Sequence, residues 1–163
     1  MATDRSQIFE VERAAFGQID EAQLVERVLA SPQAVPELEF VADEGGGVVG
    51  HLLFSHASVL ALNGPRQVLA LAPLAVRPDR QRRGIGIALT EAGLAAADEL
   101  GEPLVVVLGH QTYYPRFGFV RSDELGITPP PDYPQSDFFA LPLSSYEPSI
   151  RGQVAYPPAF DGS

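Results

Sequence analysis

Residues 71–78 read Leu-Ala-Pro-Leu-Ala-Val-Arg-Pro, and residues 81–86 read Gln-Arg-Arg-Gly-Ile-Gly. The first segment is typical of a hydrophobic strand, and the second is a turn rich in arginine and glycine that leads into a helix. Such a turn directs backbone N–H groups and the positive end of a helix dipole at one anion. Gly84 and Gly86 lack a Cβ, so the backbone there can take a positive φ and approach a phosphate closely. The segment therefore predicts a diphosphate ligand.

The charge pattern supports a local anion site on an acidic chain. Eleven basic and 21 acidic residues give a net charge of −10, which argues against a nucleic-acid partner because such proteins need widely spread positive charge. The basic residues instead gather before the glycines, at Arg77, Arg80, Arg82 and Arg83. The remaining acidic surface either attracts a cationic amine or only keeps the protein in solution.

Length and composition narrow the class of protein. The 163 residues, 45% of them hydrophobic, predict one domain over residues 1–163, with a core over about 4–143 and a tail over 144–163. The chain contains no cysteine, which excludes disulfides and thiolate zinc sites, and we expect no metal. No apolar run reaches the roughly 18 residues of a membrane helix, and no secretory signal is evident. We expect a cytoplasmic protein without a membrane partner.

Periodicity and turn residues predict an ordered set of elements. Helices are expected over residues 6–16, from Asp20 to before Ser31, over 86–100 and over 113–116, with Asp4, Asp20 and Thr112 as N-caps. Strands are expected over residues 38–42, 48–60, 67–76, 104–108, 117–121 and 138–143. The tail over residues 147–163 is expected to pack as a loop or to fray. This order indicates an α+β fold with a mixed sheet.

Two segments of the chain resemble the motifs of a known family. The pattern Gln81-x-x-Gly84-x-Gly86 is similar to the Q/R-x-x-G-x-G/A signature of the GNAT-superfamily N-acetyltransferases, and residues 113–119, Tyr-Tyr-Pro-Arg-Phe-Gly-Phe, resemble the Y-x-x-x-G-F segment of that family. The resemblance covers roughly residues 4–143. In detail it is closest to predicted bacterial acetyltransferases with a Pro-Leu-Ala-Val strand and a Tyr-Tyr-x-Arg-Phe-Gly-Phe segment.

The resemblance implies the acetyl-CoA N-acyltransferase fold, in which helices flank a mixed, mostly antiparallel central sheet. The family usually opens with a strand. Here only Met1 to Thr3 precede the first expected helix, so the first strand is shortened or missing.

The resemblance also implies contacts to acetyl-CoA, the cosubstrate. The glycine turn would hold the diphosphate, and the strand before it would hydrogen-bond the pantetheine arm and polarise the thioester carbonyl with a backbone N–H near Leu74 or Ala75. In the family this strand bulges and diverges from the next one; Pro73 cannot donate a ladder hydrogen bond, which is consistent with irregular pairing. The cofactor-binding residues implied are Leu74, Ala75, Val76, Gln81, Arg82, Arg83, Gly84, Ile85, Gly86 and Ile87.

Two catalytic residues are candidates. Tyr114 matches the family position whose hydroxyl protonates the departing thiolate, and a phenol with a pKa of about 10 is protonated at neutral pH; Tyr113 is expected to be a packing aromatic. The strand over residues 69–76 contains no carboxylate, so the general base is sought among the histidines. His110, just past a buried strand, is the first candidate, followed by His51 and His56 on the strand over residues 48–60. A lone histidine is more often structural than catalytic, and this applies to all three.

The leading hypothesis is an N-acetyltransferase in which a primary amine of a small molecule or a protein attacks acetyl-CoA directly in a ternary complex. The alternative is a non-catalytic module that senses or binds acyl-CoA, which the missing strand carboxylate would favour. A nucleotide-binding domain of another fold is disfavoured because the chain has no P-loop or dinucleotide fingerprint. The acceptor cannot be read from the residues, and a homodimer is an expectation because dimers are common in the family.

Overall fold

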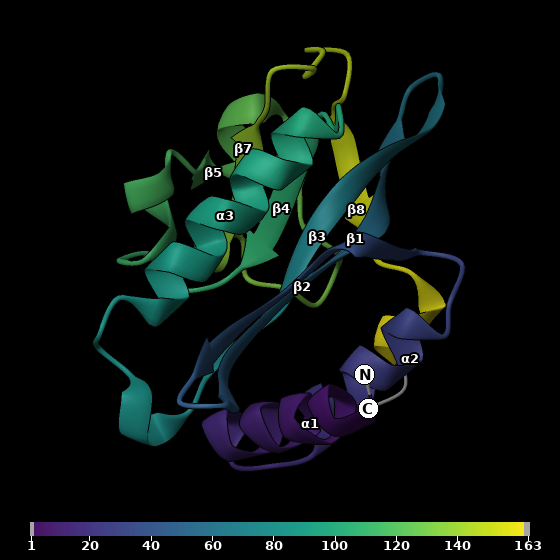
Figure 1. The fold of residues 1–163 in the computed structure, drawn as a ribbon. Coiled ribbons are helices and arrows are strands. Elements are labelled where there is room, and N and C mark those ends of the chain that lie inside the picture. The colour runs from purple at the N-terminus through teal and green to yellow at the C-terminus, as the bar shows by residue number, and fades with distance from the viewer. Residues whose placement is uncertain (1, 162–163) are drawn as a thin grey trace. The chain divides into compact units, whose positions relative to one another are not determined.

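The computed structural model describes residues 2–161 (Figure 1). Within them the helices are α1 (Ala2–Phe16), α2 (Asp20–Leu29) and α3 (Ile85–Glu99). The strands are β1 (Ala34–Glu44), β2 (Gly47–Ala61), β3 (Gly64–Val76), β4 (Leu104–Leu108), β5 (Val120–Arg121), β6 (Ile127–Thr128), β7 (Phe138–Pro142) and β8 (Gly152–Ala155). Short 3-10 turns, such as Tyr114–Phe117 and Pro158–Asp161, lie between or after them.

The strands form a mixed, mostly antiparallel sheet, as the sequence predicts. They hydrogen-bond in the order β5-β7-β4-β3-β2-β8-β6, and β1 pairs with β2. The β3–β4 and β6–β8 pairs are parallel, whereas β1–β2, β2–β8, β4–β7 and β5–β7 are antiparallel. The parallel β3–β4 pair requires a crossover connection, and α3 supplies it.

Contacts divide the described chain into two compact units. Unit 1 contains residues 2–55, 72–96 and 158–161, and unit 2 contains residues 56–71 and 97–157. Each unit has a hydrophobic core of its own. One domain over residues 1–163 stays a prediction.

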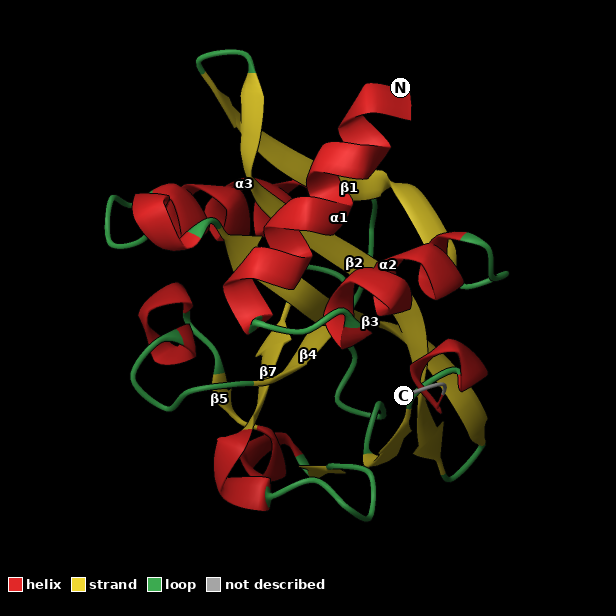
Figure 2. Cartoon of the chain, turned by 90° about the horizontal axis from the view of Figure 1, so that it is seen from below, coloured by secondary structure: helices red, strands yellow, loops and turns green. Residues whose placement is uncertain are grey.

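The core of unit 1 forms where α1 and α2 lie side by side (Figure 2). Ile8 and Val11 are three positions apart, so they share one face of α1. They pack with residues of α2, β2 and β3, namely Val25, Val28, Val48, Leu53 and Ala75. The Arg27 guanidinium donates a 2.8 Å hydrogen bond to the carbonyl of Ala159 and so attaches the C-terminal turn to α2.

Two glycines let α3 approach β2 closely in unit 1. A Cβ at Gly93 would lie 2.5 Å from Cε1 of Phe54, and a Cβ at Gly50 would lie 2.9 Å from Cδ1 of Leu89. Real Cβ atoms do not come this close to ring carbons, so Gly93 is required by the space available rather than by its backbone conformation.

The core of unit 2 is built around β4. Leu104, Val105 and Val106 are fully buried, and Val105 pairs with Leu69 on one side and Leu141 on the other. The continuous apolar run therefore forms a central strand, as expected for a strand buried on both faces.

The helices were predicted in the right places, but their caps were not. Because α1 begins at Ala2, Asp4 lies inside that helix. Asp20 is the first residue of α2 and Ile19 is its N-cap. Thr112 does not cap the next segment, which is a 3-10 turn over Tyr114–Phe117 with Tyr113 before it and no side-chain cap. Gly17 and Gly101 have positive φ values of 71° and 81° after α1 and α3, the left-handed conformation that commonly ends a helix.

The tail differs most from expectation. Residues 152–155 form β8, which pairs with β2 through Val154 and Val59 and with β6 through Gly152 and Ile127. The prediction of a loop or a frayed end for these residues is wrong. The fifth expected strand is also shorter than predicted, since β5 contains Val120 and Arg121 alone. No helix among residues 2–161 is long and apolar enough to cross a membrane.

Candidate active site

The turn between β3 and α3 lies in unit 1 and has the conformation of an anion cradle. Arg82 and Gly84 have φ values of 65° and 82°, in the left-handed region. The first helical hydrogen bond of α3 runs from the Ala88 N–H to the Gly84 carbonyl, at 3.0 Å. The preceding N–H groups, those of residues 85–87, have no acceptor inside the helix and lie at the positive end of its dipole.

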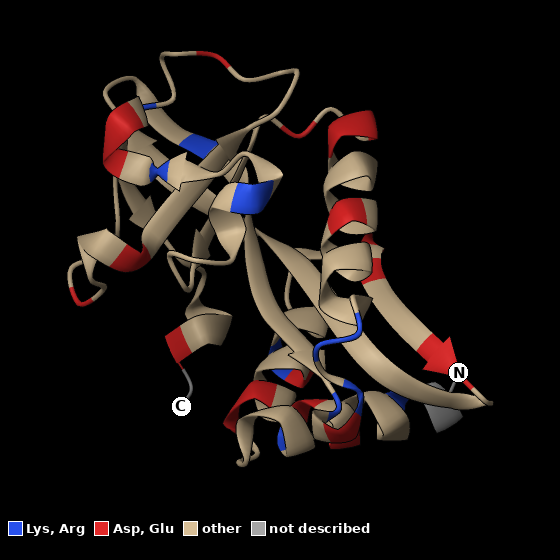
Figure 3. Ribbon diagram, turned by 90° about the vertical axis from the view of Figure 1, so that its left-hand side faces the viewer, with Lys and Arg blue, Asp and Glu red and all other residues tan. Residues whose placement is uncertain are grey.

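The arginines before α3 fall into two classes. Figure 3 shows this basic segment at the start of α3. Arg77 donates to both carboxylate oxygens of Asp79, at 3.0 and 2.7 Å, and this hydrogen bond lowers the pKa of Asp79. Arg80 is paired with Glu44 at 2.8 Å and with Asp79 at 3.0 Å. Its charge is therefore compensated by two carboxylates.

Arg82 and Arg83 form the second class. Both are exposed, and within residues 2–161 neither side chain has a hydrogen-bond or ion-pair partner. Gln81, by contrast, donates from its side chain to the carbonyl of Val76 at 3.1 Å, so its amide holds the turn against the end of β3. The cations available to a ligand at this turn are Arg82 and Arg83.

Strand β3 changes its pairing along its length. Its parallel ladder with β4 comprises Leu69 with Val105 and Ala70 with Val106, although β3 continues to Val76. In unit 1, the N–H of Arg77 donates to the Val49 carbonyl of β2 at 2.8 Å. Pro73 follows a cis peptide bond.

The three residues implied for the pantetheine arm alternate in burial. Ala75 is buried in the core of unit 1, on the side of α1, whereas Leu74 and Val76 are only partly buried. This alternation follows from the pleat of a strand. It leaves Leu74 and Val76 on the face away from α1.

Tyr114 lies in unit 2 and is held by close packing. Its side chain is 7% exposed, and its ring lies 5.5 Å from that of Phe119 and 4.9 Å from that of Tyr113, edge to face. A Cβ on Gly109 would lie 2.2 Å from Cε2 of Tyr114. Burial, with a smaller contribution from Tyr113, raises the pKa of Tyr114 above its ordinary value of 10. The phenol is therefore protonated and able to donate at neutral pH.

Tyr113 and His110 have the surroundings of supporting residues. The Tyr113 ring contacts Phe117 at 5.3 Å, and the guanidinium of Arg116 lies 5.0 Å from its centroid, as a packing aromatic would. His110 is exposed, and its carbonyl accepts a 3.1 Å hydrogen bond from the Tyr113 N–H. Its backbone thus starts the turn that carries Tyr114.

The other two histidines contact carboxylates. His56 Nε2 lies 3.0 Å from Glu102 Oε2 in unit 2. His51, in unit 1, lies between Glu12 and Glu39. Neither carboxylate was a candidate from the sequence, because nothing local connects them to His51. Among residues 2–161 no group of three or more metal-ligating side chains could hold a metal ion.

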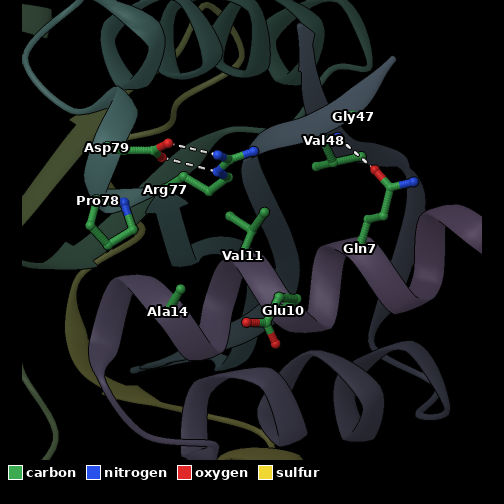
Figure 4. Close-up of a pocket in the computed structure, with 9 residues that line it drawn as sticks. All are labelled: Gln7, Glu10, Val11, Ala14, Gly47, Val48, Arg77, Pro78 and Asp79. Carbon is green, nitrogen blue, oxygen red and sulfur yellow. Dashed lines mark hydrogen bonds and ion pairs between the residues drawn. The ribbon is translucent and has the colours of Figure 1, made fainter. Parts of the chain in front are cut away.

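Unit 1 also contains a pocket of about 470 Å³ between α1, the start of β2 and the end of β3 (Figure 4). Val11, Val48 and Pro78 contribute apolar surface, and the Arg77–Asp79 pair lies at its edge. Gln7 spans from α1 to β2, where its Oε1 accepts a 2.7 Å hydrogen bond from the Val48 N–H. The pocket adjoins the residues that begin the arginine-rich turn.

The family follows from these features and from comparison with known proteins. Residues 36–121 match the model of the acetyltransferase (GNAT) domain. The chain belongs to this family.

Two curated relatives are similar in sequence. The chain is 43% identical over 117 residues to the uncharacterized N-acetyltransferase YjhQ of Escherichia coli K12, which covers 72% of this chain and 65% of YjhQ. It is 40% identical over 79 residues to the uncharacterized N-acetyltransferase YhbS of the same strain, which covers 47% of this chain and 45% of YhbS. The chain thus matches less than two thirds of the length of either relative.

Two solved structures share the whole fold. The crystal structure of Escherichia coli YhbS in complex with CoA superposes with a TM-score of 0.85 at 28% identity, covering 97% of this chain and 87% of the other. A GNAT acetyltransferase from Brucella melitensis in complex with acetyl-CoA gives 0.78 at 31% identity, covering 97% and 92%. The α+β acetyltransferase fold predicted from the sequence is confirmed.

The residues of the turn fit the diphosphate of such a ligand. Three N–H groups precede the first helical hydrogen bond, Gly84 supplies the left-handed backbone, and two arginines have no competing carboxylate. The donor set is that of an anion site at a helix N-terminus.

Proposed function

We propose that this protein binds acetyl-CoA and transfers its acetyl group to a primary amine of a small molecule or a protein. The observation that carries the proposal is the N-terminus of α3, where three N–H groups without an acceptor inside the helix follow the exposed and unpaired Arg82 and Arg83. Family membership and the two neighbours crystallised with CoA or acetyl-CoA support it.

In this proposal unit 1 holds the cosubstrate. The N–H groups of Ile85, Gly86 and Ile87 and the guanidinium groups of Arg82 and Arg83 bind the diphosphate. Backbone groups of residues 74–76 bind the pantetheine arm, and an N–H near Leu74 or Ala75 polarises the thioester carbonyl.

Transfer then proceeds by direct attack in a ternary complex. The amine nitrogen forms a bond to the carbonyl carbon, the carbon–sulfur bond breaks, and the amine loses a proton to a base, for which we propose His110. Tyr114 gives its phenolic proton to the departing thiolate and is reprotonated from solvent. The roles of Tyr114 and His110 come from the family resemblance; the Tyr114 phenol is protonated at neutral pH, as the first role requires.

Calorimetric titration with acetyl-CoA tests the cosubstrate, with dephospho-CoA and ATP as comparison ligands. We expect selective micromolar binding of acetyl-CoA. No binding to folded protein would remove the proposal.

A thiol-release assay over a panel of amines separates catalysis from the alternative, a non-catalytic acyl-CoA sensor. The enzyme releases CoA in the presence of its amine. Tight binding of acetyl-CoA without release on any amine would favour the sensor, which the absence of a carboxylate from residues 69–76 also suggests.

Three expectations stay predictions: a cytoplasmic location, no nucleic-acid partner, and a homodimer. Light scattering after size-exclusion chromatography decides between a homodimer and a monomer of 17.5 kDa.

A further inference from the structure

Four side chains form a continuous ionic network inside unit 1. His51 on β2 is completely buried, with Nδ1 lying 2.7 Å from Oε2 of Glu12 on α1 and Nε2 lying 2.8 Å from Oε2 of Glu39 on β1. The other oxygen of Glu39 accepts a 2.6 Å hydrogen bond from Arg5 on α1. The network thus joins α1 to the β1–β2 hairpin at two points.

The geometry fixes how many protons the network holds. Each ring nitrogen of His51 faces a carboxylate oxygen, and each contact requires one proton between the two atoms. A neutral imidazole carries a single N–H. Both hydrogen bonds therefore exist only if His51 is an imidazolium or if one of the two carboxyl groups is protonated.

The neighbours decide which carboxylate remains ionised. Although burial acts to raise the pKa of Glu39, hydrogen bonds from His51 and Arg5 outweigh it and lower that pKa. Burial raises the pKa of Glu12, and the charge of Glu21 on α2 adds to this effect. Burial acts to lower the pKa of His51, but the hydrogen bonds and charges of Glu12 and Glu39 outweigh it and raise that pKa. Glu39 is thus the anion, and the Glu12–His51 pair retains a proton.

The network has little capacity to tolerate loss of that proton. Glu12 is completely buried, and its second oxygen, Oε1, has no hydrogen-bond partner among the described residues. Without the proton, the ring has one N–H for two carboxylates. Either Glu12 then faces a ring lone pair, or Glu39 does and Glu12 is a buried carboxylate beside a neutral ring, with no other cation within hydrogen-bond distance among the described residues. An uncompensated buried charge is strongly destabilising. The simplest relief is movement of α1 away from the hairpin.

We propose that the proton shared by Glu12 and His51 is a latch that holds α1 on the β1–β2 hairpin. Movement of α1 would also change the pocket of unit 1, because α1 supplies Val11 and Ala14 to the wall of that pocket. It is independent of the proposed acetyl transfer, and its test needs neither acetyl-CoA nor an amine.

The direction in which stability changes with pH follows from the pKa of His51. Because its pKa is raised on folding, the stabilisation is fully present below the ordinary value of about 6.5 and is lost as pH rises through the raised value. The latch is therefore closed below the ordinary pKa of histidine and opens as pH rises through the raised pKa of His51.

Nitrogen-15 NMR of histidine side chains in the full chain tests the latch, with the His51 signals assigned by a His51→Gln variant. At pH 6, below the ordinary value of about 6.5, we expect both ring nitrogens of His51 to carry protons. As pH rises and His51 titrates, hydrogen-exchange protection factors of α1 amides, corrected for the intrinsic rate, should fall in parallel. A neutral His51 at pH 6, or α1 protection that does not follow its titration, would overturn the proposal.

A Glu12→Gln variant sharpens the test, since glutamine keeps the shape and can accept from Nδ1 without a charge. We expect the His51 midpoint to fall by about one unit and α1 protection to lose its alkaline dependence. The matched control is Glu10→Gln, an exposed site on the same helix, which should change neither. If Glu12→Gln does not fold, Glu39→Gln should lower the same midpoint. An unchanged midpoint in the folded variant rejects the latch.

Discussion

Gly109 and Tyr114 are packed so closely in unit 2 that a Cβ on Gly109 would lie 2.2 Å from Cε2 of the tyrosine ring. The ring cannot keep its position beside any larger residue. Gly109 is therefore a positioning residue for the phenol that we propose as the acid.

A Gly109→Ala substitution tests this relationship. Because the ring must shift to admit the methyl group, we expect a loss of about 1–3 kcal/mol in the free energy of unfolding, together with a lower kcat. Urea denaturation measures the first and thiol release the second. The matched control is Gly47→Ala, whose Cβ would meet Oε1 of Gln7 at an ordinary 3.7 Å. Equal stability of the two variants would contradict the prediction.

Tyr114→Phe removes the donor while preserving the packing. We expect kcat to fall by about 10²-fold, the lower end for an acid–base group, with little change in the KM for acetyl-CoA. Burial raises the pKa of Tyr114 above 10. An acid is active while protonated, so the wild type should show no alkaline loss from this group below pH 10. Tyr113→Phe should retain activity, and unchanged turnover in Tyr114→Phe would remove the assignment.

The local features of the fold could be predicted from the sequence. The apolar run Leu104–Leu108 and the glycine turn before α3 were placed correctly because both signals lie within a few neighbouring residues. The predicted N-caps were wrong. Helix α1 begins at Ala2, before Asp4, and α2 begins at Asp20 itself. An aspartate anywhere in the first turn of a helix is stabilised by the helix dipole. An aspartate near the start of a helix therefore does not by itself identify the N-cap.

Non-local pairings could not be predicted. Strand β8 is four residues long and lacks a period-two pattern, and it forms because Val154 pairs with Val59 of β2. His51 was assigned to a strand, but its partners are 39 and 12 residues away along the chain. The positions of the arginines at the glycine turn can be read from the sequence. Which of them are paired and which are free depends on Glu44 of β1, which is distant along the chain.

Gly93→Ala gives a case in which packing and helix propensity have opposite signs. Alanine is favoured over glycine by about 1 kcal/mol in a helix interior, but its methyl group would lie 2.5 Å from the ring of Phe54. We expect the clash to dominate, with a net loss of about 1–2 kcal/mol in urea denaturation. Adding Phe54→Leu should recover part of the loss specifically in the Gly93→Ala background. A stabilised single variant would show that α3 can move away from β2.

The lowered pKa of Glu39 predicts how the free energy of unfolding changes at acid pH. Its pKa is lowered on folding by His51 and Arg5, against the effect of burial. Its contribution is therefore present above the ordinary value of about 4.3 and lost as pH falls through the lowered value. The urea midpoint of the wild type should decrease as pH falls below that ordinary value, and Glu39→Gln should decrease less. Parallel profiles for the two proteins would contradict this role.

The free arginines of the turn should contribute more to binding than the paired one. Hydrogen bonds to charged groups are each worth about 1.5–3 kcal/mol, so Arg82→Ala with Arg83→Ala should weaken acetyl-CoA binding by about 10²-fold or more. Arg80→Ala changes the same turn, but that side chain is already engaged by Glu44 and Asp79, so its effect should be several-fold smaller. Calorimetry at two salt concentrations measures the affinity of each variant for acetyl-CoA. The salt dependence of this affinity should weaken most in the double variant, because it loses two unpaired charges. Equal losses for the two variants would mean that the ion pairs of Arg80 open on binding and that all three arginines contact the ligand.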